Sequence, residues 1–118
     1  MTQRILIGMI DGFGPEYLEQ SDMPNLKQMF EDGFSKQVSA VFPSVTNVNN
    51  VSIVCGAFPD EHGITGNSYF DEATVKPEYM NSASMIQAET IFARAKRHGV
   101  KSALLTSKRK TVELFAED

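Results

Sequence analysis

The chain has 118 residues, a formal net charge of −4 and a pI of about 5.1. This length suits one domain with a single core, and the 42% hydrophobic and 22% charged residues are typical of a globular protein. An acidic chain lacks the basic face that a phosphate backbone requires, so nucleic acid is excluded as a default partner.

The single cysteine, Cys55, excludes an internal disulfide and indicates a reducing compartment. The apolar run that follows Arg4 is too short for a signal peptide and for a membrane span. We therefore expect a cytoplasmic protein without a membrane partner.

In chain order, residues 5–10 form a continuous apolar run, which is typical of a strand buried on both faces of a parallel sheet. Pro24 precedes apolar residues at helical spacing, and Gly33 is the predicted end of that helix. Residues 37–42 are predicted as a second strand, which Pro43 ends.

Residues 47–55 are predicted as a helix that Gly56 ends, and residues 58–67 as a loop rich in Pro, Gly and Asp. A further helix is expected on the face formed by Met85, Ala88, Phe92 and Ala95, ending before Gly99. Residues 100–106 are a third predicted strand. This alternation predicts an α/β fold, a mostly parallel sheet with flanking helices.

The C-terminal residues 114–118 are typical of a helix that is just starting. We therefore expect residues 1–118 to be the N-terminal part of one catalytic domain, incomplete at the C-terminus. The alternative is a frayed C-terminal helix in a complete small domain. Sheet surface left uncovered in such a fragment would invite association, which makes a homodimer a candidate assembly.

Chemistry in α/β sheets gathers beyond the carboxyl ends of the strands. Asp11, Thr46 and the segment 107–110 all follow predicted strands. Asp11 is either a ligand for a divalent metal or a turn residue before Gly12. Thr46 at a helix start is either a nucleophile activated by the helix dipole and a metal, or a plain N-cap.

A larger set of motifs along the chain helps to decide between these alternatives for Asp11 and Thr46. It comprises Asp11-Gly12-Phe13, Met23-Pro24-Asn25-Leu26, Phe42-Pro43-Ser44-Val45-Thr46-Asn47-Val48-Asn49-Asn50, Gly56, Pro59 and His62-Gly63-Ile64. Together these residues resemble the phosphodiesterase branch of the alkaline phosphatase superfamily, and the resemblance covers most of the chain. Within that branch, Asn49-Asn50, Gly66-Asn67 and the pair Lys108 and Lys110 make the chain similar to the phosphonoacetate hydrolase family.

The resemblance implies hydrolysis of the carbon–phosphorus bond of phosphonoacetate to acetate and phosphate, with two zinc ions. It implies that Asp11 ligates one zinc, and that Thr46 ligates this zinc and attacks phosphorus. It further implies that Asn67 holds a phosphonate oxygen and that Lys108 and Lys110 bind the charged ends of the substrate. A type I phosphodiesterase or nucleotide pyrophosphatase, or a non-catalytic module that keeps the motif, are the alternatives.

Lys108 and Lys110 would converge on one anion if their segment is extended, because residues i and i+2 of a strand share a face. The alternative is a solvated basic turn. His62 is interpreted as part of a structural turn, His98 as a charge at a helix C-terminus and Cys55 as a buried helix residue.

A site for two zinc ions needs about six protein ligands. The chain has only two histidines, and neither lies in a ligand pattern of the family. We therefore expect that this chain alone does not hold the full metal site and does not turn over substrate.

Overall fold

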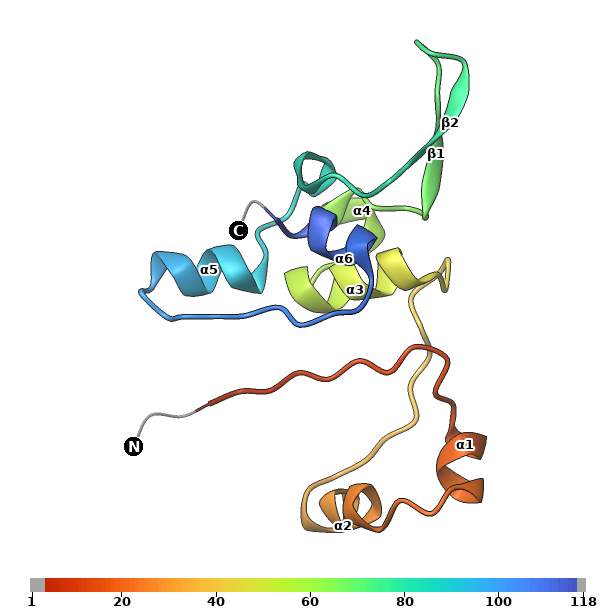
Figure 1. The fold of residues 1–118 in the computed structure, drawn as a ribbon, viewed down its shortest axis with the longest axis vertical. Helices are drawn as coiled ribbons and strands as arrows, with labels where there is room; N and C mark the ends of the chain where they lie inside the picture. Colours follow the sequence, from red (N-terminus) through yellow and green to blue (C-terminus); the bar gives the residue numbers. More distant parts are fainter. Residues whose placement is uncertain (1–3, 117–118) are drawn as a thin grey trace. The chain divides into compact units, whose positions relative to one another are not determined.

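A computed structural model describes residues 4–116, and the chain divides into two units on either side of the Ser39–Ala40 bond. The first unit contains two helices (Figure 1), α1 (Pro15–Gln20) and α2 (Pro24–Asp32). The second unit contains the remaining elements, which in chain order are α3 (Thr46–Cys55), α4 (Pro59–His62), β1 (Ser68–Asp71), β2 (Lys76–Tyr79), the 3-10 helix η1 (Ala83–Met85), α5 (Ile91–Arg97) and α6 (Arg109–Leu114).

Helices α2 and α3 end where local sequence signals predict. Pro24 opens α2, and the N–H of Gly33 donates to the carbonyl of Met29 at 3.0 Å beyond its end. Gly56 ends α3 with φ of 63°, a left-handed conformation that glycine adopts without the steric cost of a Cβ. Both predicted helices are therefore confirmed.

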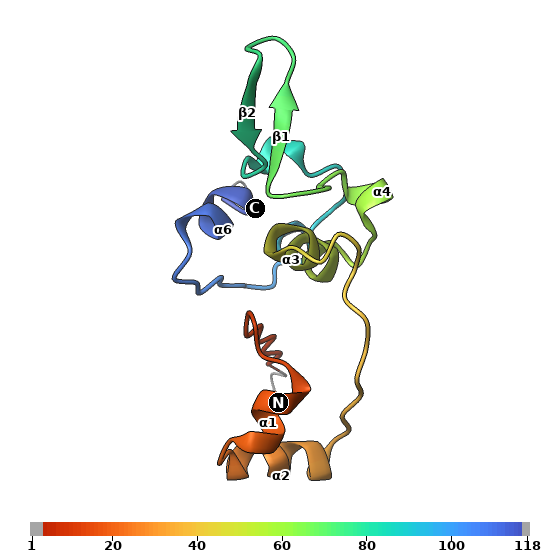
Figure 2. The ribbon, with the colours of Figure 1, turned by 90° about the vertical axis from the view of Figure 1, so that its right-hand side faces the viewer.

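The sheet of the described residues is a two-stranded antiparallel hairpin in a segment for which the sequence predicted no strand. β1 and β2 pair from Ser68 opposite Tyr79 to Asp71 opposite Lys76. At the turn, the Asp71 carboxylate accepts the Thr74 hydroxyl at 2.7 Å and a backbone N–H at 3.1 Å, which holds the pKa of Asp71 below its usual value. Figures 1 and 2 show the hairpin projecting away from the helices of its own unit.

The three predicted strands are not assigned as strands in the described residues. Residues 5–10, 37–42 and 100–106 carry no strand pairing, and their apolar side chains are largely exposed. Leu6, Phe42 and Leu105, one from each segment, are 95%, 90% and 92% exposed. The prediction of a strand was wrong for these three segments, and so was the expected burial of residues 5–10, because a strand forms only where a neighbouring strand pairs with its backbone.

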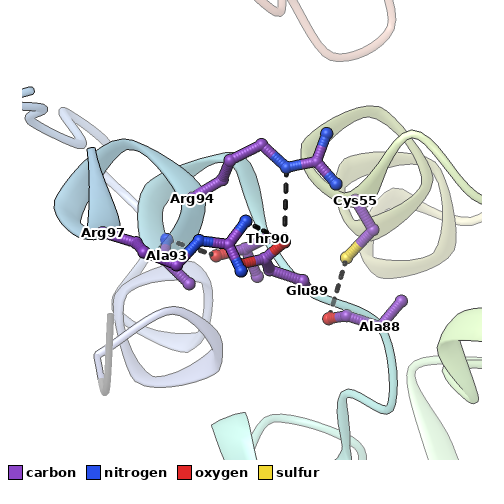
Figure 3. Close-up of polar contacts among 7 residues, drawn as sticks. All are labelled: Cys55, Ala88, Glu89, Thr90, Ala93, Arg94 and Arg97. Carbon is purple, nitrogen blue, oxygen red and sulfur yellow. Dashed lines mark hydrogen bonds and ion pairs between the residues drawn. The ribbon is translucent and has the colours of Figure 1, made fainter.

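The helix expected to run from Met85 to the residue before Gly99 is shorter than predicted, since η1 ends at Met85 and α5 begins only at Ile91. Thr90 is the N-cap of α5, and its side chain accepts the Ala93 N–H at 3.0 Å. Figure 3 shows Thr90 at this helix start, with two arginines of α5 directed at Glu89. The predicted end is confirmed, because Gly99 has a φ of 69° and follows the last turn.

The C-terminal helix also differs from its prediction. α6 runs from Arg109 to Leu114 and ends at Phe115, so no helix begins at Leu114. Residues 117 and 118 lie outside the described residues.

The core of the second unit joins α3, the loop after α4, the residue after β2 and the end of α6. Its buried apolar side chains are Val48, Val51, Ile64, Met80, Leu114 and Phe115. Phe115 also meets Phe92 of α5 edge to face, with ring centroids 5.8 Å apart. This packing fixes α3, and with it the position of Thr46. None of the helices within residues 4–116 has both the length and the apolarity that a membrane crossing requires.

Candidate functional site

Thr46 is the first helical residue of α3, not its cap. The N-cap is Val45, whose side chain makes no capping hydrogen bond, so the interpretation of Thr46 as a plain N-cap does not hold. Thr46 is half-buried. Its hydroxyl lies at the positive end of the dipole of a ten-residue helix, which favours an oxyanion or a bound anion there.

Asn67, the second candidate residue, contacts the same helix end. Its Oδ1 accepts the backbone N–H of Asn47 at 3.4 Å, and Asn47 directly follows Thr46. A backbone N–H can only donate, so the atom of Asn67 that faces it must be the carbonyl oxygen. The Asn67 amide nitrogen is therefore not the atom that meets this N–H, and the residue as a whole is exposed.

Asn49 clamps the loop that leads into α3. Its Oδ1 accepts the N–H of Val41 at 3.1 Å, and its Nδ2 donates to the carbonyl of Val45 at 3.1 Å. One amide thus binds both ends of the turn that contains Pro43. Such a clamp limits the movement of the segment that carries Thr46.

Lys108 and Lys110 do not lie on an extended segment, so the predicted geometry for this pair was wrong. Lys108 is the N-cap of α6 and Lys110 lies in its first turn, and residues two apart on a helix do not face each other. Lys110 Nζ lies 3.1 Å from the ring centroid of Tyr79 on β2, which is a cation–π contact. Arg109 Nε donates to Glu113 Oε1 at 2.7 Å.

Asp11 lies in the first unit, in a turn whose Gly12 has a φ of 75°. Its side chain is exposed. Within residues 4–116 there is no group of three or more His, Cys, Asp or Glu side chains that could hold a metal ion. The described residues therefore do not form a complete metal centre.

His62 is buried and has a structural arrangement, as the sequence predicted. Its Nδ1 accepts the N–H of Ile64 at 3.1 Å, and its Nε2 lies 2.8 Å from Ser52 Oγ. Burial lowers the pKa of His62 below 6.5, although its own backbone and the nearby charges of Asp60 and Glu61 raise it. Both ring nitrogens are engaged within the protein.

Asn47 and Met80 contact Asn67, and neither was predicted from the sequence as a site residue. Asn47 was part of the quoted motif, but its side chain was given no function. The available signal was its polarity at a position next to Val48, where a core-facing helix would ordinarily place an apolar residue.

The sequence of this chain is similar to those of known proteins. The family model of type I phosphodiesterase / nucleotide pyrophosphatase matches residues 5–113. An uncharacterised pyrophosphatase/phosphodiesterase of Schizosaccharomyces pombe is 32% identical over 85% of this chain and 22% of its own length. A bis(5'-adenosyl)-triphosphatase of Mus musculus is 38% identical over 62% of this chain and 16% of its own length.

Among solved structures, phosphonoacetate hydrolase from Sinorhizobium meliloti 1021 in complex with phosphonoacetate matches with a TM-score of 0.83 and 35% identity, over 91% of this chain and 27% of that one. Its complex with phosphonoformate matches with a TM-score of 0.73 and 37% identity, over 80% of this chain and 23% of that one. The chain thus spans about a quarter or less of each of these proteins.

These similarities confirm the resemblance inferred from the motifs and the alkaline phosphatase-like α/β fold class. The individual strands expected at residues 5–10, 37–42 and 100–106 remain the exception described above. The chain belongs to the type I phosphodiesterase/nucleotide pyrophosphatase family.

Proposed function

We propose that this chain is the N-terminal part of a catalytic domain that hydrolyses the carbon–phosphorus bond of phosphonoacetate, giving acetate and phosphate. The longer polypeptide that would carry the whole domain is called here the complete protein. The observation that carries the proposal is the TM-score of 0.83, over 91% of the chain, to a phosphonoacetate hydrolase in complex with phosphonoacetate.

In this proposal Thr46 is the nucleophile. Its oxygen bonds to phosphorus as the carbon–phosphorus bond breaks, and water then releases phosphate from the threonine. Overall, one water molecule supplies the hydroxyl group of the phosphate and the proton of the acetate methyl group. The position of Thr46 in the first turn of α3 supports this role, since the helix dipole stabilises negative charge at its oxygen.

Asn67 would donate its amide hydrogens to a phosphonate oxygen. Attack on phosphorus concentrates negative charge on the oxygens that do not react, and a donor held in place stabilises that charge. The hydrogen bond of Asn67 Oδ1 to the Asn47 N–H supports the role, because it leaves the amide nitrogen as the end available to an anion.

Two zinc ions are the proposed metals, with Asp11 and Thr46 as two of their ligands. A carboxylate and a hydroxyl are suitable oxygen donors, but the described residues hold no complete ligand cluster. Asp11 and Thr46 therefore supply only part of the ligand set that two zinc ions need. The further ligands would come from the rest of the complete protein, and we expect the isolated chain to be inactive.

Lys108 and Lys110 would bind the charged ends of the substrate. Phosphonoacetate carries a carboxylate besides its phosphonate, and each anion needs a cation. The two side chains start on either side of the first residue of α6, so they would engage two anions more readily than converge on one. Tyr79 would hold the Lys110 ammonium group near the substrate.

A second candidate function is phosphodiester or pyrophosphate hydrolysis of nucleotides. The family description and the two curated relatives favour it. The nucleophile would be the same, but a nucleotide ester lacks the carboxylate that the lysines would bind. A non-catalytic module that keeps the motif is the third reading, and it predicts that Thr46→Ala changes no reaction.

We also propose a partner, a location and an assembly for the protein. The only small-molecule partner proposed is a phosphonate, with neither nucleic acid nor membrane. We also propose a cytoplasmic location, on the grounds of the lone Cys55, and a homodimer as the assembly, on the grounds of the exposed apolar segments.

The deciding experiment measures phosphate release from phosphonoacetate by the complete protein with zinc, beside cleavage of a nitrophenyl nucleotide ester. Thr46→Ala serves as the control for a contaminating activity. Cleavage of phosphonoacetate that is lost in Thr46→Ala supports the proposal. Cleavage of the ester alone moves the function to the phosphodiesterase candidate, and cleavage unchanged by Thr46→Ala removes Thr46 as the nucleophile.

A further inference from the structure

Three residues from separate parts of the second unit close a ring of hydrogen bonds beside Thr46. The Asn47 N–H donates to Asn67 Oδ1 at 3.4 Å, and Asn47 Nδ2 donates to the carbonyl of Met80 at 3.1 Å. The Met80 N–H in turn donates to the backbone carbonyl of Asn67 at 3.0 Å. We refer to these residues as the Asn47–Asn67–Met80 triangle.

The triangle joins α3 to both ends of the β1–β2 hairpin. Asn67 directly precedes β1 and Met80 directly follows β2, so the ring closes at the base of the hairpin. Asn47 lies 20 residues before Asn67 and 33 before Met80. The Asn47 side chain is thus the link through which α3 holds the strand that leaves the hairpin.

Two corners of the triangle are buried and one is accessible. Asn47 is 7% exposed and Met80 is 9% exposed, whereas Asn67 is exposed. A buried amide that keeps its partner rigidifies its surroundings, and one that loses its partner is costly. The buried residues Asn47 and Met80 therefore hold the exposed Asn67 through two of its atoms, the side-chain oxygen and the backbone carbonyl oxygen.

From this geometry we infer that Asn47 is a positioning residue for the reaction at Thr46, acting through Asn67; the inference rests on the proposed function. Asn47 itself touches no substrate. Its backbone N–H orients the Asn67 amide, and its side chain fixes Met80, which fixes the Asn67 backbone. The donor that stabilises charge on the phosphonate is then held in place before substrate binds, which is where its catalytic value lies.

The experiment is a double-mutant cycle in the complete protein with zinc, using Asn47→Ala, Asn67→Ala and the double variant. Asn67→Ala is expected to lower kcat about 100-fold, as loss of one preorganised donor does. Asn47→Ala is expected to lower kcat about 10-fold, the effect of about one hydrogen bond. Because Asn47 acts through Asn67, the double variant is expected to be no slower than Asn67→Ala alone.

Two further variants sharpen the cycle. Asn47→Asp keeps the size of the side chain but turns a second acceptor toward the Met80 carbonyl, so it is expected to be at least as slow as Asn47→Ala. Asn50→Ala is the matched control: Asn50 is half-buried on the same helix, and within the described part of the chain its side chain makes no hydrogen bond. Its kcat is expected to equal that of the unchanged protein.

A kcat of Asn47→Ala equal to that of the unchanged protein overturns the inference. The inference is also overturned if Asn47→Ala lowers kcat by the same factor in the Asn67→Ala variant as in the unchanged protein. Such independent effects are the result of a general structural change. If the unchanged protein cleaves the nitrophenyl ester but not phosphonoacetate, the proposed substrate fails, and the same cycle on the ester decides the inference. If it cleaves neither, the proposed function falls and the inference falls with it.

Discussion

His62 Nε2 lies 2.8 Å from Ser52 Oγ, which joins helix α4 to helix α3 inside the second unit. The other ring nitrogen, Nδ1, accepts the backbone N–H of Ile64. An atom that accepts from a backbone N–H carries no proton, so the neutral ring is protonated at Nε2 and donates to Ser52. The imidazole is therefore held in one tautomer and in its neutral form.

Acid should destabilise the second unit through His62. Its pKa lies below 6.5 when folded, because burial disfavours the charged ring, so the unfolded chain binds the proton more readily. The stabilising contribution is complete above pH 6.5 and is lost as the pH falls toward the lowered folded pKa. Chemical denaturation of the chain between about pH 7.5 and pH 5.5 should show a falling free energy of unfolding.

His62→Asn should flatten this dependence, while His98→Asn should leave it intact. His98 is the other histidine of the sequence, and it is exposed at the end of α5. An equally steep pH dependence in His62→Asn would contradict the assignment.

Ser52→Ala should destabilise the chain by about 1–3 kcal/mol, because the buried Nε2–H of His62 would lose its acceptor. Urea denaturation at neutral pH measures the change. Ser35→Ala, at an exposed position of the first unit, is the control and should shift stability by less than about 0.5 kcal/mol. A neutral Ser52→Ala would mean that Ser52 is not the partner that His62 needs.

Thr90→Ala should weaken the start of α5 by about 1 kcal/mol, because the Ala93 N–H would lose its capping acceptor. Thr90→Ser keeps a hydroxyl at the cap and should retain most of the stability. Thermal unfolding of the two variants side by side tests this. Equal losses would show that the packing of the Thr90 methyl group, and not the cap, is what matters.

Lys110→Ala should raise the KM for phosphonoacetate in the complete protein about tenfold, because one charged hydrogen bond to an anion contributes about 1.5–3 kcal/mol. Cleavage of a nitrophenyl nucleotide ester, which has no carboxylate, should not change. Arg109→Ala is the control, since Arg109 is engaged with Glu113. Equal effects of Lys110→Ala on both substrates would remove its role in specificity.

The sequence by itself determined the features that depend on neighbouring residues. Gly33, Gly56 and Gly99 follow the ends of their helices, and Gly56 and Gly99 do so with positive φ, a conformation that side chains disfavour. The motif around Thr46 was sufficient to identify the family, which the match over residues 5–113 bears out. These signals are local, so they can be read in the order of the chain.

The tertiary structure decided whatever depends on distant partners. A strand needs a neighbour for its backbone, so the apolar residues 5–10, 37–42 and 100–106 could suggest strands but could not form them unaided. Lys110 meets Tyr79, and Asn47 meets Asn67 and Met80, across 20 or more residues of chain. No local spacing encodes such contacts, because they arise only when the core brings α3, the hairpin and α6 together.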